Sequence, residues 1–265
     1  DLQLEPWFEA CATGNIEYIK QNYIQFKRKK DMSKEFTKLG KYIQIPNLTG
    51  IMYAIVYNQP EVVQFLLPYE FDIITTQTTV VPIGKVPWKK LYVANLDAFT
   101  IFNKKCCQLS ENTNCIELAL IIGNVKLFRI IIDFVSNQSR EVYKSMVRHT
   151  NTQSQCVLMM LVAMNSFECN QALKNHGPLL IHYQLPFVDH YGDNCINYCI
   201  KYQNDYCLQY FLGLSIRHYF EIVKLLKTVD MTLVNQKQLK LIEGFKTRFT
   251  KEQIDEQRKM QAIDK

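Results

Sequence analysis

The chain has 265 residues, of which 48% are hydrophobic, and carries a formal net charge of +6. This composition is sufficient for a buried core, while the longest apolar runs fall far short of the roughly 20 residues that a membrane-spanning helix needs. The mild positive charge permits an acidic partner but does not require nucleic acid.

A sequence pattern that predicts two short helices joined by a tight turn recurs along the chain. The first copy covers residues 6–19, and later copies begin at Thr49, Asn114, Val157 and Asn194. The Thr and Asn residues among these starts predict N-caps, because their side chains accept hydrogen bonds from free helix amides. Gly or Asn at the end of the first helix tolerates the left-handed conformation that terminates a helix. The residues expected in that role are Gly14, Asn58, Gly123 and Asn165.

The second helix of each copy has apolar residues at helical spacing. In the second copy these residues are Val62, Val63, Leu66 and Leu67. Two antiparallel helices of this kind cannot cover their own apolar faces, so each copy must pack on its neighbours.

The pattern changes after residue 213. Residues 215–229 predict one long amphipathic helix that covers the last apolar face, and residues 236–249 predict a further helix. Thr250 and Gln253 have the spacing of a capping box. Residues 251–265 are polar and fit either a solvated helix or a frayed tail.

These copies resemble the ankyrin repeat, whose motif runs roughly Asp-x-x-Gly-x-Thr-Pro-Leu-His-x-Ala-x-x-x-Gly-His and continues into an apolar helix. The best leading turn starts at Asp189 and reads Asp-His-Tyr-Gly-Asp-Asn-Cys-Ile-Asn, with Cys199 where the motif has Ala. A degenerate copy is expected at residues 87–102. The copies depart from the family pattern because the motif His is absent and the spacing exceeds the usual period of about 33 residues. Trp7 and Trp88 fall on the inward Leu position of the motif, which predicts core packing for both.

The resemblance implies an all-α fold, an ankyrin-type solenoid of helical hairpins with β-turn or β-hairpin fingers and a C-terminal helical cap. We expect residues 1–213 to form about five or six repeats, and residues 214–265 to form the capping helices and a polar tail. Insertions are expected in the connections, near residues 23–46, 69–86, 137–155 and 176–188. The Thr- and Val-rich segment 69–86 predicts a β-hairpin finger.

The sequence contains no recognisable catalytic constellation. A Gly-rich phosphate loop, a Gly-x-Ser-x-Gly elbow and a His-Glu-x-x-His helix are all absent. A zinc site built from His190, Cys195 and Cys199 is conceivable from helical spacing, but the repeat explains both cysteines as packing residues. We therefore predict a protein that is not an enzyme and holds no cofactor or metal.

The nine cysteines are odd in number, irregularly spaced and without a Cys-x-x-Cys pair. This usage is typical of reduced, buried thiols and argues against a disulfide framework. No secretory leader pattern stands at the N-terminus. We expect a cytoplasmic protein.

The basic run Lys27, Arg28, Lys29 and Lys30 is the sharpest charge feature. It fits an electrostatic contact with an acidic partner, such as an acidic protein tail or anionic lipid, or else a solvated insertion. Nucleic acid is the least expected partner, because no RNA-binding fold or base-stacking motif is present.

The resemblance also implies where a partner would bind. Ankyrin proteins usually use the finger turns and the exposed positions just before the residue that closes the first helix. The helical residues at such positions are Thr13, Val56, Tyr57, Ile121, Ile122, Met164, Lys201 and Tyr202, and the turn residues are His190, Tyr191 and Asp193. This row is unusually apolar for a solvent-exposed surface, so it is either a binding groove or a surface that an insertion covers.

The function implied by the resemblance is a non-enzymatic scaffold whose concave face and finger turns bind another protein. The alternative is a structural or targeting component of a larger cytoskeletal or ciliary assembly. That component would dock on an acidic surface through the basic segments. On the first reading, substituting Tyr57 or Tyr202 weakens partner binding and leaves stability nearly unchanged.

Overall fold

The computed structural model describes residues 4–39, 42–82, 106–151 and 153–263. These residues form fourteen α-helices and two short two-stranded sheets, which confirms the all-α class. The chain separates into two compact units, Asp1–Met160 and Leu161–Lys265. The predicted boundary at residue 213 falls within the second unit, and the expected degenerate copy with Trp88 lies outside the described residues.

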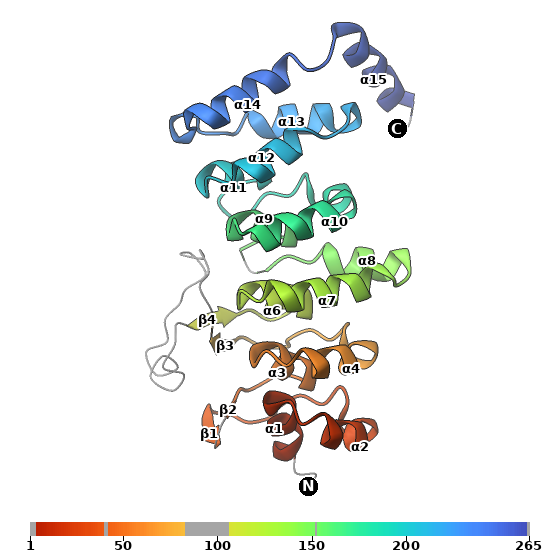
Figure 1. Cartoon of the computed structure of the whole chain (residues 1–265), viewed down its shortest axis with the longest axis vertical. Helices are drawn as coiled ribbons and strands as arrows, with labels where there is room; N and C mark the ends of the chain where they lie inside the picture. The colour runs from red at the N-terminus through yellow and green to blue at the C-terminus, as the bar shows by residue number, and fades with distance from the viewer. Residues whose placement is uncertain (1–3, 40–41, 83–105, 152, 264–265) are drawn as a thin grey trace. The chain divides into compact units, whose positions relative to one another are not determined.

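The first unit consists of successive helix pairs (Figure 1). Its helices are α1 (Glu5–Thr13), α2 (Ile16–Phe26), α3 (Gly50–Val56), α4 (Pro60–Glu70), α6 (Cys115–Ile121), α7 (Val125–Ser136) and α8 (Arg140–Val147). Helix α3 packs between α1 and α6, while α4 packs between α2 and α7. The first helices of the pairs therefore form one row, and the second helices form another.

The second unit continues with helix pairs and ends in additional helices. Helix α9 (Val157–Met164) spans the division between the units. The remaining helices are α10 (Phe167–Gln184), α11 (Cys195–Lys201), α12 (Asp205–Leu212), α13 (Tyr219–Leu226), α14 (Gln236–Lys246) and α15 (Lys251–Ile263), with 3-10 turns at Ile216–His218 and Met231–Leu233.

Predictions for the C-terminal part are confirmed in part. The single helix expected over residues 215–229 is wrong, because a 3-10 turn precedes α13 and α13 ends at Leu226. The capping box is confirmed: Thr250 N donates to Gln253 Oε1 at 2.9 Å, and Gln253 N donates to Thr250 Oγ1 at 3.3 Å. The polar segment that follows forms α15.

The turns inside the helix pairs share one backbone conformation. The four predicted closing residues all have positive φ, and Gln203 takes the same role in the turn between α11 and α12. In four of these turns, the amide of the residue after the positive-φ residue donates at 2.8 to 3.0 Å to a carbonyl of the first helix. The accepting residues are Ala10, Ala54, Ala119 and Cys199. The same left-handed helix end therefore occurs in both units.

Asparagine caps connect neighbouring helices. Asn114 Oδ1 accepts from Glu117 N at 3.0 Å, and its Nδ2 donates to Met146 O at the end of α8. Asn194 caps α11 in the same way and donates to Leu225 O at the end of α13. Each amide thus joins the start of one helix to the end of another.

The core contains the residues that the repeat pattern placed there. Trp7 is fully buried, as predicted. The cysteines whose side chains are described are buried, and burial raises the pKa of the Cys115, Cys156 and Cys207 thiols to about 12. Among the described residues, none of the helices is long and apolar enough to cross a membrane.

Candidate protein-binding site

Successive helix pairs are connected by loops that close with the same two main-chain hydrogen bonds. We call this arrangement a finger closure, with an opening residue where the loop begins and a closing residue just before the N-cap of the next helix. In the first hydrogen bond, the N–H of the opening residue donates to the carbonyl of the closing residue, at 2.8 to 3.2 Å. The opening and closing residues are Asp31 and Leu48, Thr75 and Thr113, Asn151 and Gln155, and Asp189 and Asp193.

The second hydrogen bond of each closure returns to the opening residue. Its carbonyl accepts from the amide of the residue just before the closing residue, at 2.7 to 3.0 Å. These donors are Asn47, Asn112, Ser154 and Gly192, and all four have positive φ. The four closures are therefore equivalent positions in a repeated structure.

Two of the closures are tight, and two enclose long excursions. The excursion that we name finger 1 (residues 32–47) contains β1 (Thr37–Leu39) paired with β2 (Tyr42–Gln44). The second, finger 2 (residues 76–112), contains β3 (Thr79–Pro82) paired with β4 (Cys106–Leu109). A finger was predicted at residues 69–86, but a hairpin within that segment is wrong, because the closure at Thr75 brings the later strand against β3.

The insertion expected near residues 23–46 contains most of finger 1, but the last two expected insertions do not form fingers. Residues 137–155 contain α8 and a tight closure, and most of residues 176–188 extend α10 to Gln184.

Finger 1 is fixed on α3 by a buried carboxylate and a tyrosine. The Tyr53 hydroxyl donates to Asp31 Oδ2 at 2.5 Å and accepts from Ile45 N at 2.5 Å. Asp31 Oδ1 accepts from Ser33 N at 2.8 Å and from Gln44 Nε2 at 3.3 Å. Because Asp31 is only 2% exposed, these bonds also satisfy a group whose burial would otherwise be costly.

Tyr57 holds the strand β2 of finger 1. Its hydroxyl accepts from Ile43 N at 2.7 Å and donates to Ile43 O at 3.2 Å. Burial raises the pKa of Tyr57. Tyr57 therefore supports the finger and does not stand free for a partner, which differs from the role the sequence predicts.

The two fingers are tied to each other at their bases. Asn47 Nδ2 donates to Gln77 O at 3.0 Å, and Thr76 Oγ1 donates to Asn47 Oδ1 at 2.6 Å. A cleft of about 450 Å³ lies between the fingers. Its lining includes Lys34, Phe36 and Pro46 from finger 1, and Thr78, Val80 and Gln108 from finger 2. No carboxylate lines this cleft among the described residues.

The predicted basic patch is engaged within the chain. The Arg28 guanidinium binds both Asp72 carboxylate oxygens, at 2.7 and 3.1 Å, and donates to Tyr69 O. This pair raises the pKa of Arg28 and lowers that of Asp72, chiefly through the shared hydrogen bonds. Arg28 N donates to the buried Glu70 carboxylate at 2.7 Å. Arg28 therefore joins the end of α2 to the end of α4.

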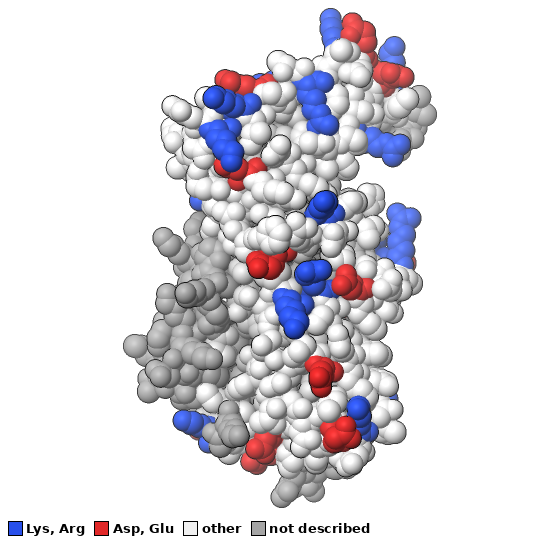
Figure 2. Space-filling view, in the orientation of Figure 1, with Lys and Arg blue, Asp and Glu red and all other residues white. Residues whose placement is uncertain are grey.

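The lysines on either side of Arg28 have neighbours as well. Lys27 Nζ lies 5.3 Å from the centre of the Tyr69 ring, and Lys30 Nζ donates to Ile74 O at 2.8 Å. Burial lowers the pKa of Lys30. Lys29 is exposed. On the described part of the face in Figure 2, basic and acidic residues are interspersed and form no broad basic surface.

The predicted helical contact residues do not form one exposed row. Ile121, the last residue of the fully buried helix α6, is 2% exposed, and Ile122, which follows it, is 8% exposed. Of the two alternatives for this row, an open groove or a covered surface, the burial of these two isoleucines favours the covered surface. Val56 and Met164 are half-buried, while Thr13 is exposed.

The predicted turn residues of the second unit lie in the tight closure that opens at Asp189. His190 and Tyr191 are exposed in the tight closure, and the Lys201 ammonium pairs with Asp193. The Tyr202 ring lies 5.6 Å from the Tyr198 ring. Burial, with smaller contributions from Asp193 and Asp189, raises the pKa of Tyr202.

The conceivable zinc ligands do not converge. His190 is exposed, whereas Cys195 and Cys199 are buried in α11. Within the described ranges, no group of three His, Cys, Asp or Glu residues is placed to hold a metal ion.

The residues that fix finger 1 were not singled out from the sequence. Tyr53 and Tyr198 are both the fourth residue after a helix cap, and each binds the Asp that opens its closure. That common position is the signal that could have identified Asp31.

No protein-family model matches the chain, and a comparison with curated proteins finds no similar one.

Proposed function

We propose that this chain is a non-enzymatic interaction module, an ankyrin-type solenoid that binds a partner protein through its fingers. One observation carries the proposal. Two successive finger closures are enlarged, clamped to each other through Asn47, and separated by a cleft. A loop that only connects helices needs no such support, because a tight closure such as that of Asp189 suffices.

Repetition supports the solenoid part of the proposal. The left-handed helix ends and the finger closures recur at equivalent positions, and first helices pack on first helices in the first unit. Each pair then buries its apolar face against its neighbours, as arrays of this kind do.

The cleft has the chemistry of a surface that takes an extended segment of a protein. Both sheets have only two strands among the described residues, so no described strand lies beyond β1, β3 or β4, whereas the backbone of β2 is bonded to Tyr57 on its outer side. The exposed Thr78 and Gln108 add neutral hydrogen-bonding groups, and the exposed Lys34 adds a positive charge.

Blocking the cleft tests the proposal. In the variant Thr78→Arg, a long cation replaces a small exposed side chain of the lining. Partners captured by the wild-type protein and identified by mass spectrometry should be lost, while helix content and unfolding by urea remain as in the wild type.

The matched control is Thr37→Arg, the same substitution at an exposed position of finger 1. Phe36 lines the cleft, whereas Thr37, the next residue, does not. Full capture by Thr78→Arg, or equal loss with Thr37→Arg, contradicts binding in the cleft. Capture that fades steeply between low and moderate salt would favour docking of the basic segments.

A further inference from the structure

The cleft between the fingers combines one positive charge with an apolar surface. Among the described residues, Lys34 is the only charged residue of its lining, whereas Phe36 and Pro46 of finger 1 and Val80 of finger 2 are apolar. The rest of the lining is neutral and polar, and consists of Gln77, Thr78, Thr79 and Gln108. A molecule in the cleft therefore meets a cation beside apolar side chains.

The charge of Lys34 is not compensated by the described part of the chain. The exposed Lys34 forms no ion pair with a described residue, and the neighbouring Glu35 does not line the cleft. A second cation lies near the base of finger 2, where Lys30 Nζ donates to Ile74 O at 2.8 Å. The electrostatic complement of this lining is an anionic group.

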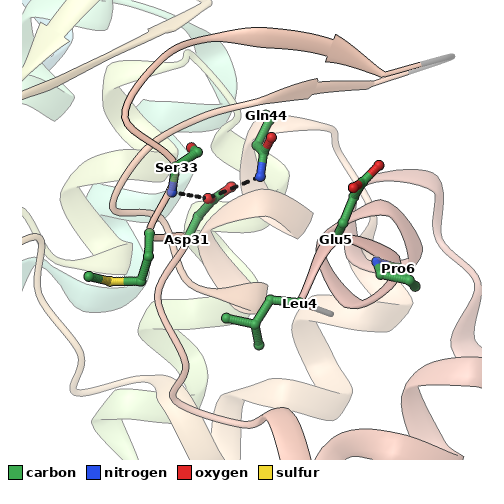
Figure 3. Close-up of a pocket in the computed structure, with 7 residues that line it drawn as sticks. Leu4, Glu5, Pro6, Asp31, Ser33 and Gln44 are labelled. Carbon is green, nitrogen blue, oxygen red and sulfur yellow. Dashed lines mark hydrogen bonds between the residues drawn. The ribbon is translucent and has the colours of Figure 1, made fainter. Parts of the chain in front are cut away.

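The start of finger 1 is held in place next to Lys34. Figure 3 shows the buried Asp31 carboxylate accepting hydrogen bonds from the Ser33 amide, at 2.8 Å, and from Gln44 Nε2, at 3.3 Å. Ser33 directly precedes Lys34, and Gln44 belongs to β2 in the returning half of the finger. This wall of the cleft is therefore fixed before a partner binds, which reduces the entropy lost on binding.

The two walls suit a segment with alternating side chains. Lys34 and Phe36 both line the cleft, and Glu35 between them does not. On the other wall, Val80 lies directly opposite Gln108 in the register of β3 and β4. An extended segment presents every second side chain on one face, about 7 Å apart. Such a segment can therefore place one side chain at the cation and the next but one on the apolar surface.

We propose that the cleft binds an extended segment of the partner in which a carboxylate faces Lys34. An apolar side chain two residues away packs on Phe36 and Val80. This inference rests on the proposed function, since it names the chemistry of the segment that the fingers bind. It assigns the acidic contact to Lys34 and not to the predicted basic patch, where Arg28 already pairs with Asp72.

The probe is a displayed library of short random peptides, selected on the wild-type protein and on variants in parallel. The wild type should enrich peptides with Asp or Glu two residues from an apolar residue. Lys34→Glu replaces the cation by a carboxylate and should enrich Lys or Arg at that position instead. The matched control is Lys38→Glu, at an exposed lysine of finger 1 that does not line the cleft, and it should keep the acidic preference.

The affinity of one selected acidic peptide gives the size of the effect. Because Lys34 is exposed, Lys34→Met should weaken binding about threefold and Lys34→Glu about tenfold, while Lys38→Glu leaves the affinity unchanged. A single exposed ion pair also predicts only a modest loss between low and moderate salt. Selected peptides without an acidic preference, or equal weakening by Lys38→Glu, overturn the inference.

Thr78→Arg separates this inference from the proposed function. Loss of enrichment with Thr78→Arg, together with the reversed preference of Lys34→Glu, supports both. Loss with Thr78→Arg while Lys34→Glu selects the same peptides as the wild type refutes the acidic segment and leaves the cleft as the binding site. Enrichment of the same peptides by Thr78→Arg, or no enrichment by the wild type, refutes both. If the wild type enriches no peptide and self-associates on gel filtration while Thr78→Arg is monomeric, the occupant is a second copy of the chain.

Discussion

In the first unit, the closure between Asp31 and Leu48 encloses a finger with its own strands; in the second, the closure between Asp189 and Asp193 encloses a tight turn. Both closures use the same two main-chain hydrogen bonds. In both, the carboxylate of the opening Asp accepts a hydrogen bond from a tyrosine of the following helix, Tyr53 or Tyr198. The two closures differ in the length and structure of the segment between the opening and the closing residue.

This comparison shows how the loop between two helix pairs can be enlarged while the hydrogen bonds that close it are kept. The entropy cost of closing a loop grows slowly with its length, so a long excursion between fixed ends is tolerated. The excursion then needs supports of its own. In finger 1 these supports are two hydrogen bonds: the Tyr53 hydroxyl accepts from Ile45 N, and the Tyr57 hydroxyl accepts from Ile43 N in β2. The tight turn contains no strand that would need such a support.

The largest expected difference is between Tyr53→Phe and Tyr198→Phe. Loss of the Tyr53 hydroxyl leaves Asp31 Oδ2 and the Ile45 amide without a partner, although Asp31 Oδ1 keeps its two donors, and should lower the free energy of unfolding by about 2 to 3 kcal/mol. Tyr198→Phe removes a 2.9 Å bond to Asp189, whose carboxylate keeps two backbone donors, and should cost about 1 kcal/mol.

Urea unfolding measures both changes, and hydrogen exchange of the Ile45 amide reports on the finger alone. If the two variants lose equal stability, or if the Ile45 amide stays protected in Tyr53→Phe, the tyrosine does not fix the excursion.

A smaller difference is expected at the left-handed residue of each closure, Asn47 in the first unit and Gly192 in the second. Asn47→Gly keeps the backbone conformation but removes the bonds to Thr76 and Gln77, and should cost about 1 to 2 kcal/mol. Gly192→Asn should change stability by less than about 1 kcal/mol, since nothing lies within 4 Å of an added Cβ and Asn tolerates this conformation.

Thermal unfolding of the two variants, followed by circular dichroism, checks this pair. The reverse order of effects would mean that Asn47 serves only the turn and does not tie the fingers together.

The helices and their ends could be predicted from the sequence because their causes are local. Gly14, Asn58, Gly123 and Asn165 are residue types that tolerate positive φ, and apolar spacing identified the helices around them. The sequence did not predict Gln203 as a closing residue, because Gln is not typical of the positive-φ conformation.

The fingers could be predicted only in outline, because their pairing is long-range. Nothing local links Thr79–Pro82 to Cys106–Leu109, and the residues that join them are the closure at Thr75 and Thr113. Burial of Ile121 and Ile122 likewise depends on packing around α6 and not on the period of the helix. The supports of finger 1 are polar residues in the core, which a search for apolar patterns passes over.

The smallest expected difference concerns Tyr57 and Tyr202, which follow directly after the first helices of the two repeats. Tyr57→Phe should cost about 1 kcal/mol, because its hydroxyl bonds both backbone groups of Ile43. Tyr202→Phe should have almost no effect, since the Tyr202 hydroxyl has no hydrogen-bond partner among the described residues. Faster hydrogen exchange of the Ile43 amide in Tyr57→Phe, with unchanged exchange in α11 of Tyr202→Phe, is the expected result. If Tyr57→Phe leaves that exchange unchanged but abolishes capture of the partner, the tyrosine is a contact residue after all, and the difference between the two closures lies in Tyr53 alone.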